Sequence, residues 1–272
     1  MLRRKSDRTD ADGLLEALRC ADLRPVPVKT PDQQGIQGLH RLREHHKAQR
    51  TAAINLMRGL LREFGIAIPA GAGKVRAAVL AALEDGDNAL PMALRTTLAQ
   101  MLEQIAAAEC AMQGIETSLR EFSERDGRSQ RLQRAAGIGL ITATAMSASI
   151  GEIDRFASGR QFASDLGLTP REHSSGNTRK LSRITKRGDT YLRMLLIHGA
   201  RAGLRSAKVA KAKGVALDKT QAWALGLSER VGHNKAAVAL ANKTARRLWA
   251  AEHHRQSFDP DHVSARPAPT SH

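Results

Sequence analysis

Apolar residues recur at three- and four-residue spacing along two long stretches of the chain. The first stretch covers roughly residues 30–63, and Thr30 at its start is a residue type that caps helices. The second covers roughly residues 90–123, and a loop with proline and glycine at residues 67–73 lies between them. The pattern predicts two long helices paired as an antiparallel hairpin or coiled coil, an arm over residues 30–127 that acts as a spacer or an oligomerisation surface.

The first part of the chain predicts a shorter helix. Residues 11–23 have helical spacing, and Pro25 and Pro27 end that pattern. Residues 26–29 are compatible with a short strand. The apolar stripe of the expected helix consists of Leu14, Leu15 and Leu18.

The composition changes near residue 126. Residues 128–252 are more basic and richer in glycine than the arm, and we expect them to form a compact helical domain. The tail over residues 253–272 is polar and contains proline, so we expect disorder there. Alanine and leucine are abundant while aromatic residues make up 3%, which favours a mainly α fold.

The net charge of the chain indicates which kind of molecule it binds. The formal net charge is +16 and the sequence pI is about 10.8. A folded protein this basic usually meets a polyanion, and nucleic acid is the first candidate. The alternatives are plain solubility or an anionic membrane surface. We expect a cytoplasmic location, because the two cysteines allow no disulfide framework and no signal peptide or membrane span is visible.

The basic excess is concentrated behind two adjacent serines. Residues 171–211 contain eleven lysines and arginines against two acids, a local charge of +9. Before most of these cations stand Ser174 and Ser175, in a Ser-Ser-Gly-Asn segment that reads as a loop. A serine hydroxyl attacks a phosphodiester only when it is activated and held in line, and His173 is the one obvious base nearby. The alternative is a solvated turn before a basic helix.

Two further segments could contact phosphate or metal. Gly137 and Gly139 separate two helical patterns, as in helix-hairpin-helix modules that grip a phosphate through backbone N–H groups. A tight turn without a ligand explains them equally well. Asp7 and Asp10 share one helix face and could hold a divalent cation such as Mg²⁺, or they could simply complement a helix N-terminus. Two carboxylates are too few for a two-metal site.

These segments, in this order, resemble the DEDD-type insertion-sequence transposases, whose full-length members use a bridge RNA to recombine DNA. The resemblance covers nearly the entire chain up to about residue 250. Its cues are KSDRTDA at 5–11, the helical arm, AAGIGLITATAMSASIG at 135–151, RF at 155–156, LGLTP at 166–170, SSG at 174–176, ITKRG at 184–188 and LR at 192–193.

The resemblance implies a role for each segment. Family members carry four acidic metal ligands on a RuvC-like α/β domain and a serine nucleophile on a separate C-terminal domain. Asp7 and Asp10 correspond to the last two acids, with Mg²⁺ as the cation. Ser175 corresponds to the nucleophile, and Ser174 is the runner-up. Expected partners are DNA, a bridge RNA and further copies of the chain joined through the arm.

The sequence also departs from the family pattern. The first two acids of the family lie upstream of the KSDRTDA element, which leads us to expect a truncated transposase that is inactive as this chain. Residues 1–29 would then be the end of the RuvC-like domain, and residues 128–252 the serine domain. Ser182 and Asp189 stand where the family has Gly and Asn. The alternative function is a non-catalytic nucleic-acid-binding remnant.

We expect the DNA-binding surface to combine the glycine hairpin with cations around and after the serine loop. Its candidate residues are Gly137, Gly139, Arg179, Lys180, Arg183, Lys186, Arg187 and Arg193.

Overall fold

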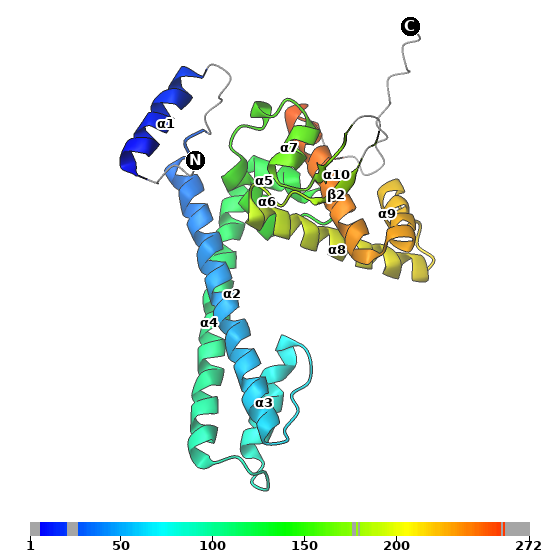
Figure 1. Cartoon of the computed structure of the whole chain (residues 1–272). Helices are drawn as coiled ribbons and strands as arrows, with labels where there is room; N and C mark the ends of the chain where they lie inside the picture. The colour runs from blue at the N-terminus through cyan, green and yellow to red at the C-terminus, as the bar shows by residue number, and fades with distance from the viewer. Residues whose placement is uncertain (1–5, 21–26, 176–177, 179, 257, 259–272) are drawn as a thin grey trace.

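The computed structural model describes residues 6–20, 27–175, 178, 180–256 and 258. It is mainly helical, as the periodicity and composition predict. A long two-helix arm projects from a compact bundle of shorter helices, and a small β-hairpin lies on the bundle (Figure 1). Among the described residues, no helix is long and apolar enough to cross a membrane.

The arm is built by α2 (Pro31–Glu63) and α4 (Met92–Arg125), which pack against each other along their length. Thr30 begins α2 as predicted, because its side chain accepts a hydrogen bond from the backbone N–H of Gln33. The helices η1 (Ala72–Lys74) and α3 (Val75–Glu84) close the tip. The apolar core of the tip is formed by Ile54, Met57, Leu61, Val75, Val79, Ala82, Leu90, Leu98, Leu102 and Ile105.

The bundle places a second, larger core above the arm. It consists of α5 (Gly127–Gln133), α6 (Leu140–Ile150), η2 (Ile153–Arg155), α7 (Gly159–Asp165), α8 (Thr190–Ala212), α9 (Lys219–Val231) and α10 (His233–His253). Helix α10 packs against α7, α8 and α9, and α6 contacts both arm helices. The bundle and the arm are therefore joined through α6.

The hairpin consists of β1 (Pro170–Glu172) and β2 (Leu181–Ile184), which pair in antiparallel order. The sequence predicts the loop between them but not the strands. The reason is that all but one of these seven strand positions are exposed, so no alternation of apolar and polar residues marks them.

Helix α1 (Asp7–Arg19) buries none of its residues. The predicted helix is present, but it begins before residue 11, and its apolar stripe is exposed. Residues 27–29 are not a strand, which corrects that expectation for the described part of residues 26–29. Most of the predicted disordered tail lies outside the described residues.

Candidate functional site

The two serines lie at the end of the β-hairpin. Beyond β1 the pairing continues to Ser175 and Thr178, whose backbone N–H and C=O groups exchange hydrogen bonds of 3.3 and 3.2 Å. His173 N–H donates to the carbonyl of Lys180 at 2.9 Å, in the same register. Ser175 is therefore held by backbone pairing at a defined position, although its side chain is exposed.

The two serine hydroxyls have different surroundings. Ser174 Oγ donates to Glu172 Oε1 at 2.7 Å and accepts from the backbone N–H of Lys180 at 3.3 Å. Ser175 Oγ makes no hydrogen bond within the described part of the chain. Successive residues of a strand point to opposite faces, which places Ser174 with Glu172 and Ser175 with His173. One serine is engaged in the hairpin and the other is available.

The base of the hairpin is locked by two glycines. Gly167 and Gly188 have φ values of +66° and +76°, a region that L-residues with side chains rarely adopt. A Cβ atom at Gly188 would collide with the carbonyl oxygen of Asp165, and one at Gly167 with that of Arg187. The chain before β1 and the chain after β2 therefore approach closely enough that only glycine fits at both positions.

Arg193 bonds both chain segments at the base of the hairpin, and its burial corrects the expectation that it contacts DNA. Arg193 is 7% exposed, and its guanidinium donates to the carbonyls of Leu166 and Arg187 at 3.1 and 3.0 Å and to Thr190 Oγ1 at 3.1 Å. A buried charge is tolerated when its donors are satisfied in this way. Arg193 is therefore a structural group under the hairpin and is not on the surface where DNA could reach it.

The other predicted cations remain on the surface. Lys180, Arg183, Lys186 and Arg187 are all exposed, and Arg179 lies outside the described residues. Lys186 has a φ of +57°, unusual for a residue with a side chain, and its N–H donates to the carbonyl of Gly167 at 3.2 Å. The cations thus line the returning strand and the turn that leads into α8.

Close packing accounts for one of the two predicted phosphate-gripping glycines. Gly137 has a φ of +84°, and a Cβ there would lie 2.9 Å from the carbonyl oxygen of Gly199 in α8. Gly139 instead is the N-cap of α6, with open space around its Cα and no side-chain cap. It borders a hollow of about 610 Å³ that Arg134 also lines. A backbone contact with phosphate is geometrically possible at Gly139.

Asp7 and Asp10 lie on the first turn of α1, both exposed. Ser6 caps this helix, and Asp7 and Asp10 complement its dipole. The two acids therefore also fit the alternative role, which is to stabilise a helix N-terminus. Within the described residues, no group of three or more His, Cys, Asp or Glu is arranged to hold a metal. Mg²⁺ is often bound by one or two carboxylates with water and substrate phosphate, so the pair fits one such ion but not two.

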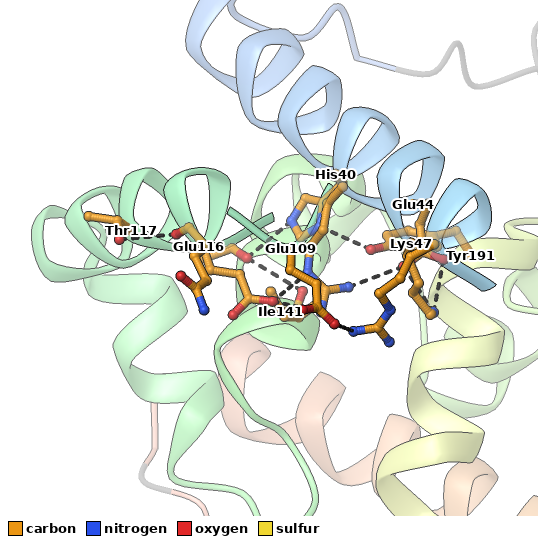
Figure 2. Close-up of polar contacts among 12 residues, drawn as sticks. His40, Glu44, Lys47, Glu109, Glu116, Thr117, Ile141 and Tyr191 are labelled. Atoms are coloured by element: carbon orange, nitrogen blue, oxygen red, sulfur yellow. Dashed lines mark hydrogen bonds and ion pairs between the residues drawn. The ribbon is translucent and has the colours of Figure 1, made fainter. Parts of the chain in front are cut away.

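Sequence reasoning missed a polar junction between the arm and the bundle. His40 of α2 is 3% exposed; its Nδ1 lies 3.1 Å from Tyr191 Oη, and its Nε2 lies 3.1 Å from Thr144 Oγ1, as Figure 2 shows for His40 and Tyr191. Thr144 Oγ1 donates to the carbonyl of Leu140 at 2.8 Å, so it accepts from His40 Nε2–H, and His40 Nδ1 accepts from Tyr191. The signal in the sequence was a histidine four residues after Ile36, on the apolar face of α2.

The junction favours the neutral form of both rings. Burial, reinforced by the nearby Arg43 charge, lowers the pKa of His40 to about 4. Burial and Glu44 raise the pKa of Tyr191 to about 12. Arg43 itself forms an ion pair with Glu116 of α4 at 2.7 Å, which ties the two arm helices together beside the junction. Since Tyr191 lies in the first turn of α8, shortly after the basic turn, the junction sets the position of the arm relative to the hairpin base.

Comparison with known proteins identifies the family. The model of the transposase IS116/IS110/IS902 family matches residues 129–214, which include the glycine turn, the hairpin and all of α8. The chain is 42% identical over 253 residues to a "Probable family 20 transposase" of Pseudomonas aeruginosa, covering 90% of this chain and 71% of that protein. The chain belongs to the IS116/IS110/IS902 transposase family.

Two other relatives support this assignment. The transposase for insertion sequence element IS1111A of Coxiella burnetii is 39% identical, over 90% of this chain and 66% of the relative. The transposase for insertion sequence element IS1328 of Yersinia enterocolitica is 33% identical, over 90% of this chain and 71% of the relative. The chain thus spans roughly two thirds of the length of these transposases. Family membership indicates DNA as a partner.

Proposed function

We propose that this transposase cuts and joins DNA of an insertion sequence through Ser175. The observation that carries the proposal is the difference between the two hydroxyls: Ser174 is bonded to Glu172 and Lys180, while Ser175 is exposed without a described partner. A nucleophile must be free to approach phosphorus in line, and the hairpin pairing holds Ser175 for that approach.

The reaction that suits this arrangement is phosphoryl transfer to serine. Ser175 Oγ forms a bond to phosphorus, the bond from phosphorus to one sugar oxygen breaks, and that oxygen leaves with a proton. The hydroxyl proton of Ser175 goes to a base, and His173 lies on the same face of the strand. The exposed Arg183, Lys186 and Arg187 would hold the neighbouring phosphates.

The finer family features are part of the same proposal. Asp7 and Asp10 would bind Mg²⁺, as part of a RuvC-like domain. When bound, the ion would withdraw negative charge from a phosphate oxygen. A bridge RNA would select the DNA, and the exposed faces of α2 and α4 would join copies of the chain. Gly139 would contribute a backbone contact to phosphate, in the manner of a helix-hairpin-helix element.

A second function has one observation in its favour. No group of three or more metal-ligating residues occurs in the described part of the chain, so a chain that binds nucleic acid without turnover is the alternative. Both functions use the same basic surface. They differ in whether a covalent protein–DNA adduct ever forms.

The experiment that tests the serine assignment is adduct trapping on labelled DNA from the ends of the insertion sequence. The protein is assayed alone and supplemented with the part of the Pseudomonas relative that it does not span, with Mg²⁺ and RNA transcribed from the element. We expect an adduct in the supplemented reaction, lost with Ser175→Ala while DNA binding changes little, because the substitution removes a nucleophile and no charge. Ser174→Ala should only reduce the yield.

Digestion of the adduct to the modified residue decides between the serines. A phosphoserine linkage at position 174, or an undiminished adduct with Ser175→Ala, would contradict the assignment. Absence of any adduct in the supplemented wild-type reaction, with binding intact, would favour the non-catalytic function.

A further inference from the structure

An exposed tryptophan lies on the α9–α10 face of the bundle, outside the hairpin site. Trp223 of α9 is 37% exposed, and the ammonium of Lys243 from α10 lies 4.2 Å from the centroid of its ring. The other tryptophan of the chain, Trp249, donates its indole N–H to the carbonyl of Phe156 at 3.1 Å and stacks on His253, so its position is explained by packing. Packing gives no such reason for the exposed ring of Trp223.

Positive charge gathers on α10 beside Trp223. Lys243, Arg246 and Arg247 occupy adjacent positions on successive turns of α10. Lys243 and Arg246 make no ion pair with the described part of the chain. Burial and the charges of Arg247 and Arg246 together lower the pKa of Lys243, and Asp218 opposes them only in part. Like charges at this spacing destabilise a helix, so an anionic ligand would relieve a cost that folding incurs.

We propose that Trp223, Lys243 and Arg246 form a binding site for an unpaired stretch of nucleic acid, distinct from the serine hairpin. The cations would contact consecutive phosphates, and the Trp223 ring would stack on a base. A duplex hides the flat faces of its bases and presents only backbone and groove edges, so the tryptophan selects for unpaired nucleotides.

The position of the site connects it to the hairpin. Asn242, the residue before Lys243, donates its side-chain amide to the carbonyl of Leu168, two residues before β1. Helix α10 is therefore bonded directly to the segment that leads into the hairpin. A strand whose phosphates are held by Lys243 and Arg246 would lie on the helix that supports the proposed reaction site. Binding at this site can be measured without any catalysis.

The test measures binding of the full chain to a thymidine homopolymer, a uridine homopolymer of equal length and a duplex of equal length. We expect the tryptophan fluorescence to be quenched by both single strands and hardly by the duplex, because stacking quenches an indole. Trp223→Ala should weaken binding to the single strands about tenfold and leave the duplex nearly unaffected. Trp223→Phe should retain most of the affinity, because a phenyl ring still stacks on a base. It should lose most of the quenching, because the remaining fluorophore is Trp249, which lies outside the proposed site.

The charge contribution is tested by Lys243→Ala, with Lys211→Ala as the matched control. Lys211 is exposed on α8 and pairs with Glu229 at 3.5 Å. On the single strands, Lys243→Ala should reduce the slope of log affinity against log salt by about 0.7, the value for one phosphate contact, and the control should change it less. Tighter binding of uridine would identify RNA as the ligand, and tighter binding of thymidine would identify displaced DNA.

Three outcomes would overturn the proposal. The first is that Trp223→Ala binds both single strands as tightly as the wild type does. The second is that Trp223→Ala loses as much affinity for the duplex as for the single strands. The third is that single strands still quench the fluorescence of Trp223→Phe. Helical content by circular dichroism identifies a variant that has failed to fold, and Trp223→Phe then still gives a decisive result. Ser175→Ala should bind the single strands as the wild type does, so failure of the serine assignment leaves this result intact.

Discussion

At the scale of single residues, His40 shows how one buried ring couples distant elements. It is neutral because burial in the arm–bundle junction lowers its pKa to about 4, against about 6.5 in an unfolded chain. The unfolded state therefore binds more protons than the folded state between these values. Stability from this residue is fully present above pH 6.5 and is lost as the pH falls towards 4, by up to about 3 kcal/mol.

We predict that the free energy of unfolding falls over this pH window in the wild type and falls less in His40→Gln, which cannot titrate. Urea unfolding of both proteins at several pH values measures the difference between them. That difference should shrink as the pH is lowered from 7 to 4. A difference independent of pH would mean that His40 is not buried in its neutral form.

At the scale of elements, the hairpin depends on its base more than on its own short strands. We predict that Gly188→Ala destabilises the bundle by about 3 kcal/mol or more, because a Cβ there meets the carbonyl of Asp165 in addition to the strain of positive φ. Gly214→Ala is the matched control, since Gly214 has a φ of +71° with nothing within 4 Å of a Cβ. The control should cost about 1 kcal/mol. Thermal unfolding of both variants checks the prediction, and equal losses would contradict the close approach.

At the scale of the whole molecule, the net charge of +16 raises the question of where DNA is bound. We predict that changing Arg183, Lys186 and Arg187 to Ala weakens duplex binding on all sequences alike and lowers the salt slope by about 0.9 per lost phosphate contact. The matched control removes three exposed cations at the arm tip, Arg62, Lys74 and Arg76. Binding titrations at several salt concentrations should show a smaller loss for the control. Equal losses would mean that total charge, not the hairpin surface, sets the affinity.

The sequence by itself determined the features that arise from local patterns. Helical periodicity predicted α2 and α4, because an amphipathic stripe and a Thr30 cap act within a few residues. The order of short motifs between residues 5 and 193 resembles that of insertion-sequence transposases, and the comparisons confirm a transposase of the IS116/IS110/IS902 family. The roles of the two serines and of Asp7 and Asp10 stay predictions.

Only the tertiary structure decided which of the candidate residues are accessible. Arg187 and Arg193 are both arginines of the same basic segment, and the sequence gives no reason to separate them. Arg193 is nevertheless buried, because it bonds the carbonyl of Leu166, 27 residues earlier in the chain. Gly137 is fixed by the close approach of Gly199 in α8. His40 is neutral because it is buried between three helices, where it bonds Thr144 of α6 and Tyr191 of α8. These partners are set by packing between distant segments, which local periodicity cannot encode.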